Sequence, residues 1–140
     1  MKPVQRVAET REQVAVQKLA ESRQSLDAQQ AKLEELCRYR DQYSASFKTS
    51  GGQGLDANRL QDYRVFLARL NEAIRQQQAI LAECASVHEQ TRQQWVKTRS
   101  HHQAIDKVIE RYRSEERKAQ DRHEQKEQDE HSQRSRDKSP

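Results

Sequence analysis

The sequence predicts an all-α protein in which two long helices form an antiparallel coiled-coil hairpin, with the C-terminal helix longer and overhanging the first. Three observations predict this fold class. Only 32% of the 140 residues are hydrophobic, so the chain has too little apolar surface for a broad globular core. Apolar residues nevertheless recur with the period of a coiled-coil seam. The three glycines lie together between residues 51 and 54, and proline occurs only as Pro3 and Pro140.

The first helix is predicted over residues 4–47. This segment contains no proline and consists largely of good helix formers. Three of its leucines are each one heptad apart, although three polar residues interrupt neighbouring core-like positions. The interruptions are Arg23, Gln30 and Arg40, and the predicted apolar stripe comprises Val7, Val14, Val16, Leu19, Leu26, Leu33, Leu36, Tyr43 and Phe47.

A turn is predicted over residues 48–57. Gly51, Gly52 and Gly54 can adopt the positive φ that a helix C-cap and a sharp reversal require. A phosphate-binding P-loop needs a strand before the glycines and a lysine after them, whereas here Lys48 precedes them and no strand pattern is present. With the reversal near residue 52, the numbers of facing residues should sum to about 105, because both helices rise equally per residue.

That register has two consequences. Cys37 and Cys84 would lie on layers about 24 Å apart, which excludes a disulfide between them in the hairpin. The first helix would also end opposite residue ~101 of the second helix. The remainder of the second helix would then project without an intramolecular partner, and its outer turns should fray or bind another molecule.

The second helix is predicted over residues 58–130, followed by a frayed or disordered tail at 131–140. Alternating steps of three and four define its seam, and eleven of the sixteen seam positions are apolar. The seam consists of Leu60, Tyr63, Leu67, Leu70, Ile74, Gln77, Leu81, Cys84, His88, Thr91, Trp95, Thr98, His102, Ile105, Ile109 and Tyr112. A repeat held over this length favours a coiled coil over disorder.

Charge and hydropathy narrow the classes of partner. The formal net charge is +4, but residues 110–140 carry nine basic and nine acidic side chains, so the excess is diffuse over the rest of the chain. Direct nucleic-acid binding is disfavoured because it usually requires clustered positive charge. No apolar run approaches the ~20 residues of a membrane span, and no signal peptide is evident. A cytosolic location with reduced cysteines is therefore expected.

No constellation of residues predicts catalysis, a cofactor or a metal. The five histidines show no zinc-site spacing with cysteine or aspartate. A two-helix hairpin also has no enclosed cleft to exclude water or to shift the pKa of its many carboxylates. The protein is expected not to be an enzyme, and its charged segments are interpreted as solvated helix faces.

A stripe beside the seam of the second helix has more functional interest. Phe66, Leu70, Ala73 and Gln77 follow one another at the spacing of one helix face. Phe66 could fold over the seam as packing, or it could be an exposed hydrophobic anchor for another protein. The residue pattern alone leaves both interpretations open.

The sequence resembles the FliJ family of bacterial flagellar export proteins over most of its length. The resemblance is strongest in DANRLQDYRVFLARLNEAIRQQQAIL (56–81), and it continues through Trp95 and RKAQDRHEQKEQDE (117–130). It also includes LCRYRDQY (36–43) before the glycines. The positions of the aromatic and apolar residues are stronger evidence for the resemblance than the charge pattern, because unrelated coiled coils often have similar compositions.

The resemblance implies a two-helix stalk of the type III export apparatus, at the inner membrane of the flagellar base. Its implied partners are the export ATPase hexamer, whose ring the helix ends enter, the cytoplasmic domain of the export gate protein, and export chaperones. The implied gate contact is the stripe Phe66, Leu70, Ala73 and Gln77, in which Gln77 stands where many relatives carry histidine. The implied ATPase contacts are Arg6, Arg11, Lys18, Arg111, Arg113, Arg117, Lys118 and Arg122.

Two other functions stay open at this point. An equivalent stalk of a virulence-type secretion system would have the same mechanism in a different apparatus. A nucleic-acid-associated coiled-coil arm would fit the positive net charge, and it would show a steep salt dependence of binding. A monomer is expected in each case, because one hairpin satisfies its own seam, although dimerisation through Phe66 is an alternative.

Overall fold

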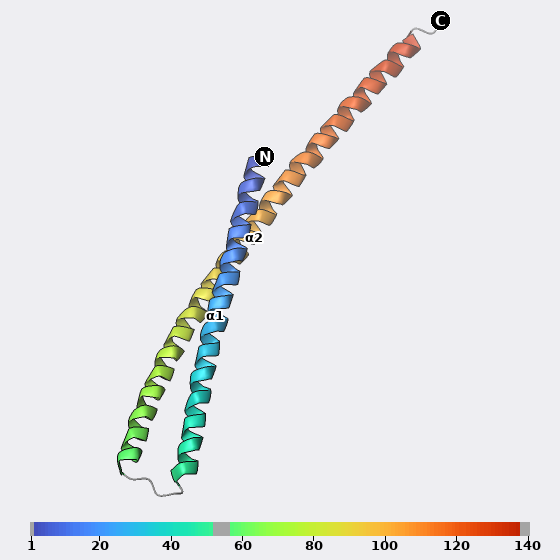
Figure 1. Cartoon of the computed structure of the whole chain (residues 1–140). Helices are drawn as coiled ribbons and strands as arrows, with labels where there is room; N and C mark the ends of the chain where they lie inside the picture. Colours follow the sequence, from blue (N-terminus) through green and yellow to red (C-terminus); the bar gives the residue numbers. More distant parts are fainter. Residues whose placement is uncertain (1, 52–56, 138–140) are drawn as a thin grey trace. The chain divides into compact units, whose positions relative to one another are not determined.

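The computed structural model describes residues 2–51 and 57–137, and all of these residues are helical. Helix α1 spans Lys2–Gly51 and helix α2 spans Ala57–Asp137. The predicted all-α hairpin with a longer second helix is confirmed (Figure 1). Neither helix has, within these residues, a stretch that is long and apolar enough to cross a membrane.

The chain divides into two compact units. The hairpin unit is Gln13–Val96, in which the C-terminal part of α1 packs against the N-terminal part of α2. The terminal unit combines Met1–Glu12 with Lys97–Pro140. None of the described side chains is buried completely. Each unit therefore has no broad core, and a single layer of contacts between two helical segments stabilises it.

The predicted seam of α2 is confirmed between Tyr63 and Ile109. Every residue at the alternating steps of three and four in this range is buried or half-buried. Leu70 and Ile74 are buried in the hairpin unit, and Ile109 is buried in the terminal unit. The two outermost positions, Leu60 and Tyr112, are exposed.

The predicted stripe of α1 is wrong in its N-terminal part. Val7, Val14 and Val16 are exposed, whereas Ala8 and Ala15 are only 3% and 8% exposed. From Leu19 to Phe47 the predicted apolar residues are buried or half-buried. The observed seam keeps strict steps of three and four and comprises Gln5, Ala8, Glu12, Ala15, Leu19, Ser22, Leu26, Gln29, Leu33, Leu36, Arg40, Tyr43 and Phe47.

The observed register lies close to the predicted one in the hairpin unit. Gln29 contacts Gln77 and Ser22 contacts His88, so the numbers of facing residues sum to 106 and 110. In the terminal unit Gln5 contacts Asp106. The pairing of α1 therefore reaches beyond residue 101 of α2, because the first helix begins at Lys2 and the numbers of this facing pair sum to 111 instead of about 105.

The helix ends also differ from the predicted bounds. Helix α1 continues to Gly51, beyond the predicted end at residue 47, and α2 continues to Asp137, beyond residue 130. Neither extension contains proline, and residues 48–50 and 131–137 contain no glycine, so no strong helix breaker interrupts them. The predicted roles of Gly52 and Gly54 in the turn lie outside the described residues.

The two cysteines are free thiols, and both are half-buried in the hairpin unit. Cys84 Sγ lies 3.9 Å from Ser25 Oγ of the facing helix. Cys84 therefore lies opposite Ser25 and not opposite Cys37. The two cysteines lie in different layers of the hairpin, as the predicted register implies.

Candidate interaction sites

Five aromatic side chains form a cluster between the helices of the hairpin unit. The rings of Phe47 and Tyr63 stack with centroids 3.6 Å apart. Tyr43 lies 4.4 Å from Phe66 and 5.5 Å from Tyr63, between centroids. Tyr39 completes the cluster by meeting Phe66 edge-on at 6.0 Å. Sequence reasoning missed Tyr39, which lies one helix position outside the seam and is half exposed.

The structure brings the predicted gate stripe together on α2, but it does not present the stripe as a fully exposed face. Leu70 and Gln77 are buried, and Phe66 and Ala73 are half-buried. Phe66 packs against Tyr39 and Tyr43 of α1. Phe66 therefore folds over the seam as packing and is half-buried, so it is not a fully exposed anchor.

Polar pairs interrupt the seam of the hairpin unit. The amide nitrogen Nε2 of Gln77 donates to the backbone oxygen of Gln29 at 3.0 Å and to its side-chain Oε1 at 2.7 Å. His88 Nδ1 lies 2.9 Å from Ser22 Oγ, and that hydroxyl donates to the carbonyl of Leu19 at 2.8 Å. Because the serine hydrogen is already donated to Leu19, the serine oxygen accepts a hydrogen bond from His88 Nδ1–H. Neutral His88 in this arrangement therefore carries its proton on Nδ1.

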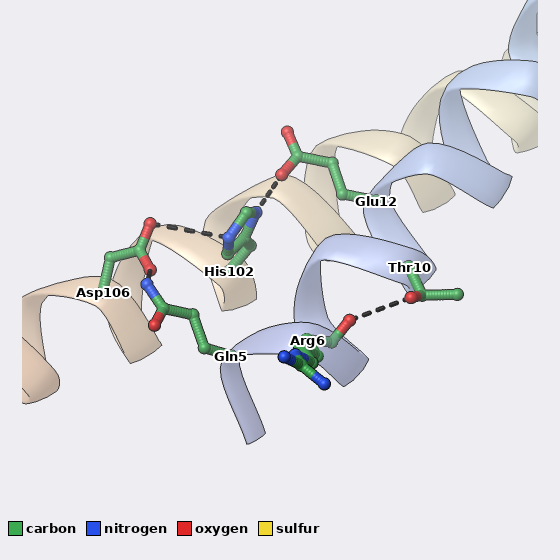
Figure 2. A network of polar contacts seen from close by, with 6 residues as sticks. All are labelled: Gln5, Arg6, Thr10, Glu12, His102 and Asp106. Carbon is green, nitrogen blue, oxygen red and sulfur yellow. Dashed lines mark hydrogen bonds and ion pairs between the residues drawn. The ribbon is translucent and has the colours of Figure 1, made fainter. Parts of the chain in front are cut away.

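A polar network joins α1 to α2 in the terminal unit (Figure 2). His102 Nδ1 contacts Glu12 Oε2, and the other ring nitrogen, Nε2, lies 3.5 Å from Asp106 Oδ2. Gln5 Nε2 donates to the second oxygen of Asp106 at 3.3 Å. Beside the network, the Thr10 hydroxyl donates to the carbonyl of Arg6 at 2.9 Å, within α1. Sequence reasoning placed His102 on the seam but missed its carboxylate partners.

The network favours a charged imidazole. The hydrogen bond with Glu12 raises the pKa of His102 above its ordinary value of 6.5, and the nearby charges of Asp106, Glu12 and Glu9 act in the same direction. Partial desolvation opposes them. A protonated ring can donate from both nitrogens, one to each carboxylate, so protonation strengthens the contact between the two helices.

We expect the pairing of residues 2–12 with α2 to weaken as the pH rises. A raised folded-state pKa means that the His102 contribution is complete below 6.5 and is lost as the pH passes through the folded-state value. Amide hydrogen exchange over residues 2–12, corrected for intrinsic rates, should therefore show less protection at pH 8 than at pH 5.5. His102→Gln should remove this dependence, and His101→Gln, at the exposed neighbour, should keep it. A titration that puts the His102 pKa below 6.5 would contradict the interpretation.

The predicted ATPase contacts are all exposed. Lys18 belongs to the hairpin unit, and the other seven belong to the terminal unit. Arg122 Nε donates to the carbonyl of Lys118 at 3.3 Å. Among residues 2–51 and 57–137, no ion pair engages any of the eight side chains, so their charges face solvent.

The C-terminal part of α2 is a charged, exposed helix. From Glu110 to Asp137, only Ser114 is half-buried and the other residues are exposed. This confirms that α2 overhangs α1, although the overhang begins after Ile109 and not near residue 101. The described part of the chain contains no group of three or more histidine, cysteine or acidic side chains that could hold a metal ion.

Comparison with known proteins gives one match. The family model described as "Flagellar FliJ protein" matches residues 1–139. No curated protein and no solved structure matches the chain.

Proposed function

Since the chain belongs to the flagellar FliJ protein family, we propose that this component of flagellar export is a non-enzymatic stalk and adaptor that links the export ATPase to the export gate. The observation that carries the proposal is the unequal length of the helices. Helix α2 has 81 residues and α1 has 50, so the terminal unit ends in a single narrow helix with exposed charge. A ring lumen admits such a helix more easily than a helix pair.

The proposed ATPase contact lies in that terminal unit. Five of the predicted basic residues are exposed on the overhang, and Arg6 and Arg11 are exposed on the part of α1 in the same unit. Solvated arginine and lysine side chains suit electrostatic association with an acidic surface. The terminal-unit residues of this set are Arg6, Arg11, Arg111, Arg113, Arg117, Lys118 and Arg122, and Lys18 is the member in the hairpin unit.

The proposed gate contact lies in the hairpin unit and comprises Phe66, Leu70, Ala73 and Gln77. Its accessible parts are the open edges of Phe66 and Ala73, because Leu70 and Gln77 are buried. In this proposal the buried Leu70 and Gln77 hold Phe66 and Ala73 in place and do not touch the gate domain. Glutamine in place of histidine at position 77 should therefore affect gate binding less than it would at an exposed position. Export chaperones are further proposed partners, and the protein works at the cytoplasmic side of the flagellar base.

One experiment separates the two contacts. We expect a chain that ends at Glu110 to capture the export ATPase at least ~10-fold less well than the full chain, because it lacks the exposed basic overhang. The same chain should still capture the cytoplasmic gate domain, since the hairpin unit is intact. A chain that ends at Glu130 keeps all eight basic residues and serves as the control. Unchanged ATPase capture after removal of residues 111–140 would overturn the inserted-stalk proposal.

The alternatives predict other results. A virulence-type stalk would bind the ATPase of that apparatus in preference to the flagellar enzyme. A nucleic-acid arm would bind DNA or RNA with a steep salt dependence. The family match favours the flagellar function over both.

A further inference from the structure

The apolar edge of α2 in the hairpin unit is longer than the proposed gate stripe. Phe66, Ala73, Ile80 and Val87 are each seven residues apart, so they form one row along the flank of the seam. Phe66 and Ala73 are half-buried, whereas Ile80 and Val87 are 47% and 45% exposed. The row is therefore partly covered at its Phe66 end and exposed at its Val87 end.

A row of matching period lies on α1 opposite this edge. Lys18, Ser25, Lys32 and Tyr39 are also seven residues apart. Two contacts show that this row faces the same side of α2: the Tyr39 ring meets Phe66, and Ser25 Oγ lies 3.9 Å from Cys84 Sγ. The two rows therefore form the walls of one groove along the hairpin unit.

The groove is hollow beside Lys32 and Tyr39 of the α1 row. A depression of about 540 Å³ is lined on one side by Lys32, Leu36 and Tyr39 of α1 and on the other by Gln77 of α2. Glu35, Arg38 and Gln42 of α1 also line it. Ile80 and Val87 continue the row of α2 beyond this depression, and an exposed apolar strip of this period matches the apolar face of an amphipathic helix.

Charge indicates which kind of helix fits. Lys18 and Lys32 are both exposed, and no ion pair among the described residues engages either ammonium group. Lys32 lines the hollow, and Lys18 lies two heptads before it in the same row. Glu21 and Glu35 follow the two lysines by three residues each. The two lysines are two heptads apart, which places their ammonium groups opposite carboxylates two heptads apart on an occupying helix.

We propose that this groove is a docking site for an amphipathic helix of a partner protein, with its apolar face on Ile80 and Val87 and carboxylates along the edge that meets Lys18 and Lys32. The groove shares Phe66 and Ala73 with the proposed gate stripe, and to that extent the inference rests on the proposed function. It adds Ile80, Val87 and the lysine row, none of which belongs to that stripe.

The test uses the full chain and two synthetic peptides. Each peptide has about three heptads, with leucines on the apolar face and either glutamates or lysines along one edge. We expect the glutamate peptide to bind the wild type at least ~5-fold more tightly than the lysine peptide, from two exposed ion pairs. Val87→Glu should weaken binding of the glutamate peptide more than ~10-fold, because it places a carboxylate in the apolar wall. Fluorescence anisotropy measures both effects.

Matched substitutions off the groove control for general effects. Val65 is 42% exposed and lies outside both rows, so Val65→Glu should leave peptide affinity within ~2-fold. Lys32→Glu should abolish the preference for the glutamate peptide, because the new carboxylate offsets the charge of Lys18, whereas Lys48→Glu should keep the preference. Equal affinity of the two peptides, no binding of the glutamate peptide, or equal effects of Val65→Glu and Val87→Glu would each overturn the proposal.

The cytoplasmic gate domain is then titrated against the same variants. Loss of gate binding in Val87→Glu but not in Val65→Glu supports the groove as the gate-binding surface. If the peptides discriminate as expected and the gate domain does not bind the wild type, the groove stands and the proposed gate contact fails. If the gate domain binds and the peptides do not discriminate, the gate contact stands and the groove proposal is overturned.

Discussion

Tyr43→Ala is expected to lower the free energy of unfolding of the protein by about 3 kcal/mol. Tyr43 contacts three other rings, those of Tyr39, Tyr63 and Phe66, and it is half-buried. The loss combines the removed apolar area with several aromatic contacts. Because Tyr43 is half-buried, the expected change lies at the lower end of the values for truncating an aromatic side chain in a core.

Denaturant unfolding followed by circular dichroism measures this effect, and Tyr112→Ala is the control. Tyr112 lies in the terminal unit and is exposed, so its truncation should change stability by less than ~0.5 kcal/mol. Equal effects of the two substitutions would show that the cluster does not stabilise the hairpin unit. The result also bears on the gate stripe, because Phe66→Ala removes a member of this cluster and would weaken binding indirectly.

The seam of α2 could be predicted from the sequence because its period is regular and its large side chains follow the period. The first turns of α1 could not be predicted in the same way, because hydrophobicity and period disagree there. Val7 and Val14 are the more apolar residues, but Ala8 and Ala15 hold the seam positions. Stepping back from Leu19 by four and three residues reaches Ala15, Glu12, Ala8 and Gln5. The period alone would have identified them.

The interaction sites were less predictable, because they depend on which residues of two distant segments face each other. A sequence shows that Glu12 and His102 are both ionisable, but only the register brings them together. The register itself depends on where the chain reverses, and an error of a few residues there changes every facing pair. For the same reason Phe66 could be identified as unusual beside the seam, whereas its packing against Tyr39 could not.

A further large effect is expected at the polar pair of the hairpin seam. The double variant Gln29→Leu/Gln77→Leu should raise the free energy of unfolding by about 1–3 kcal/mol, because replacing a buried polar pair by apolar side chains of similar size is often stabilising. Gln77→Leu alone should be less stable than the double variant. It removes both hydrogen bonds to Gln29 and leaves the half-buried amide of Gln29 without this partner. A double-mutant cycle separates the two contributions.

The added stability should come with a loss of specificity. With leucine at both positions, the seams from Leu26 to Leu36 and from Leu67 to Leu81 become nearly uniform, and a shift by one heptad or pairing with another chain buries similar surface. Light scattering should then show larger species than for the wild type. The exposed neighbours Gln30 and Gln76, replaced together by leucine, control for added hydrophobicity. A double variant that is less stable than the wild type and unchanged in mass would contradict this role, since polar pairing would then contribute stability and not register.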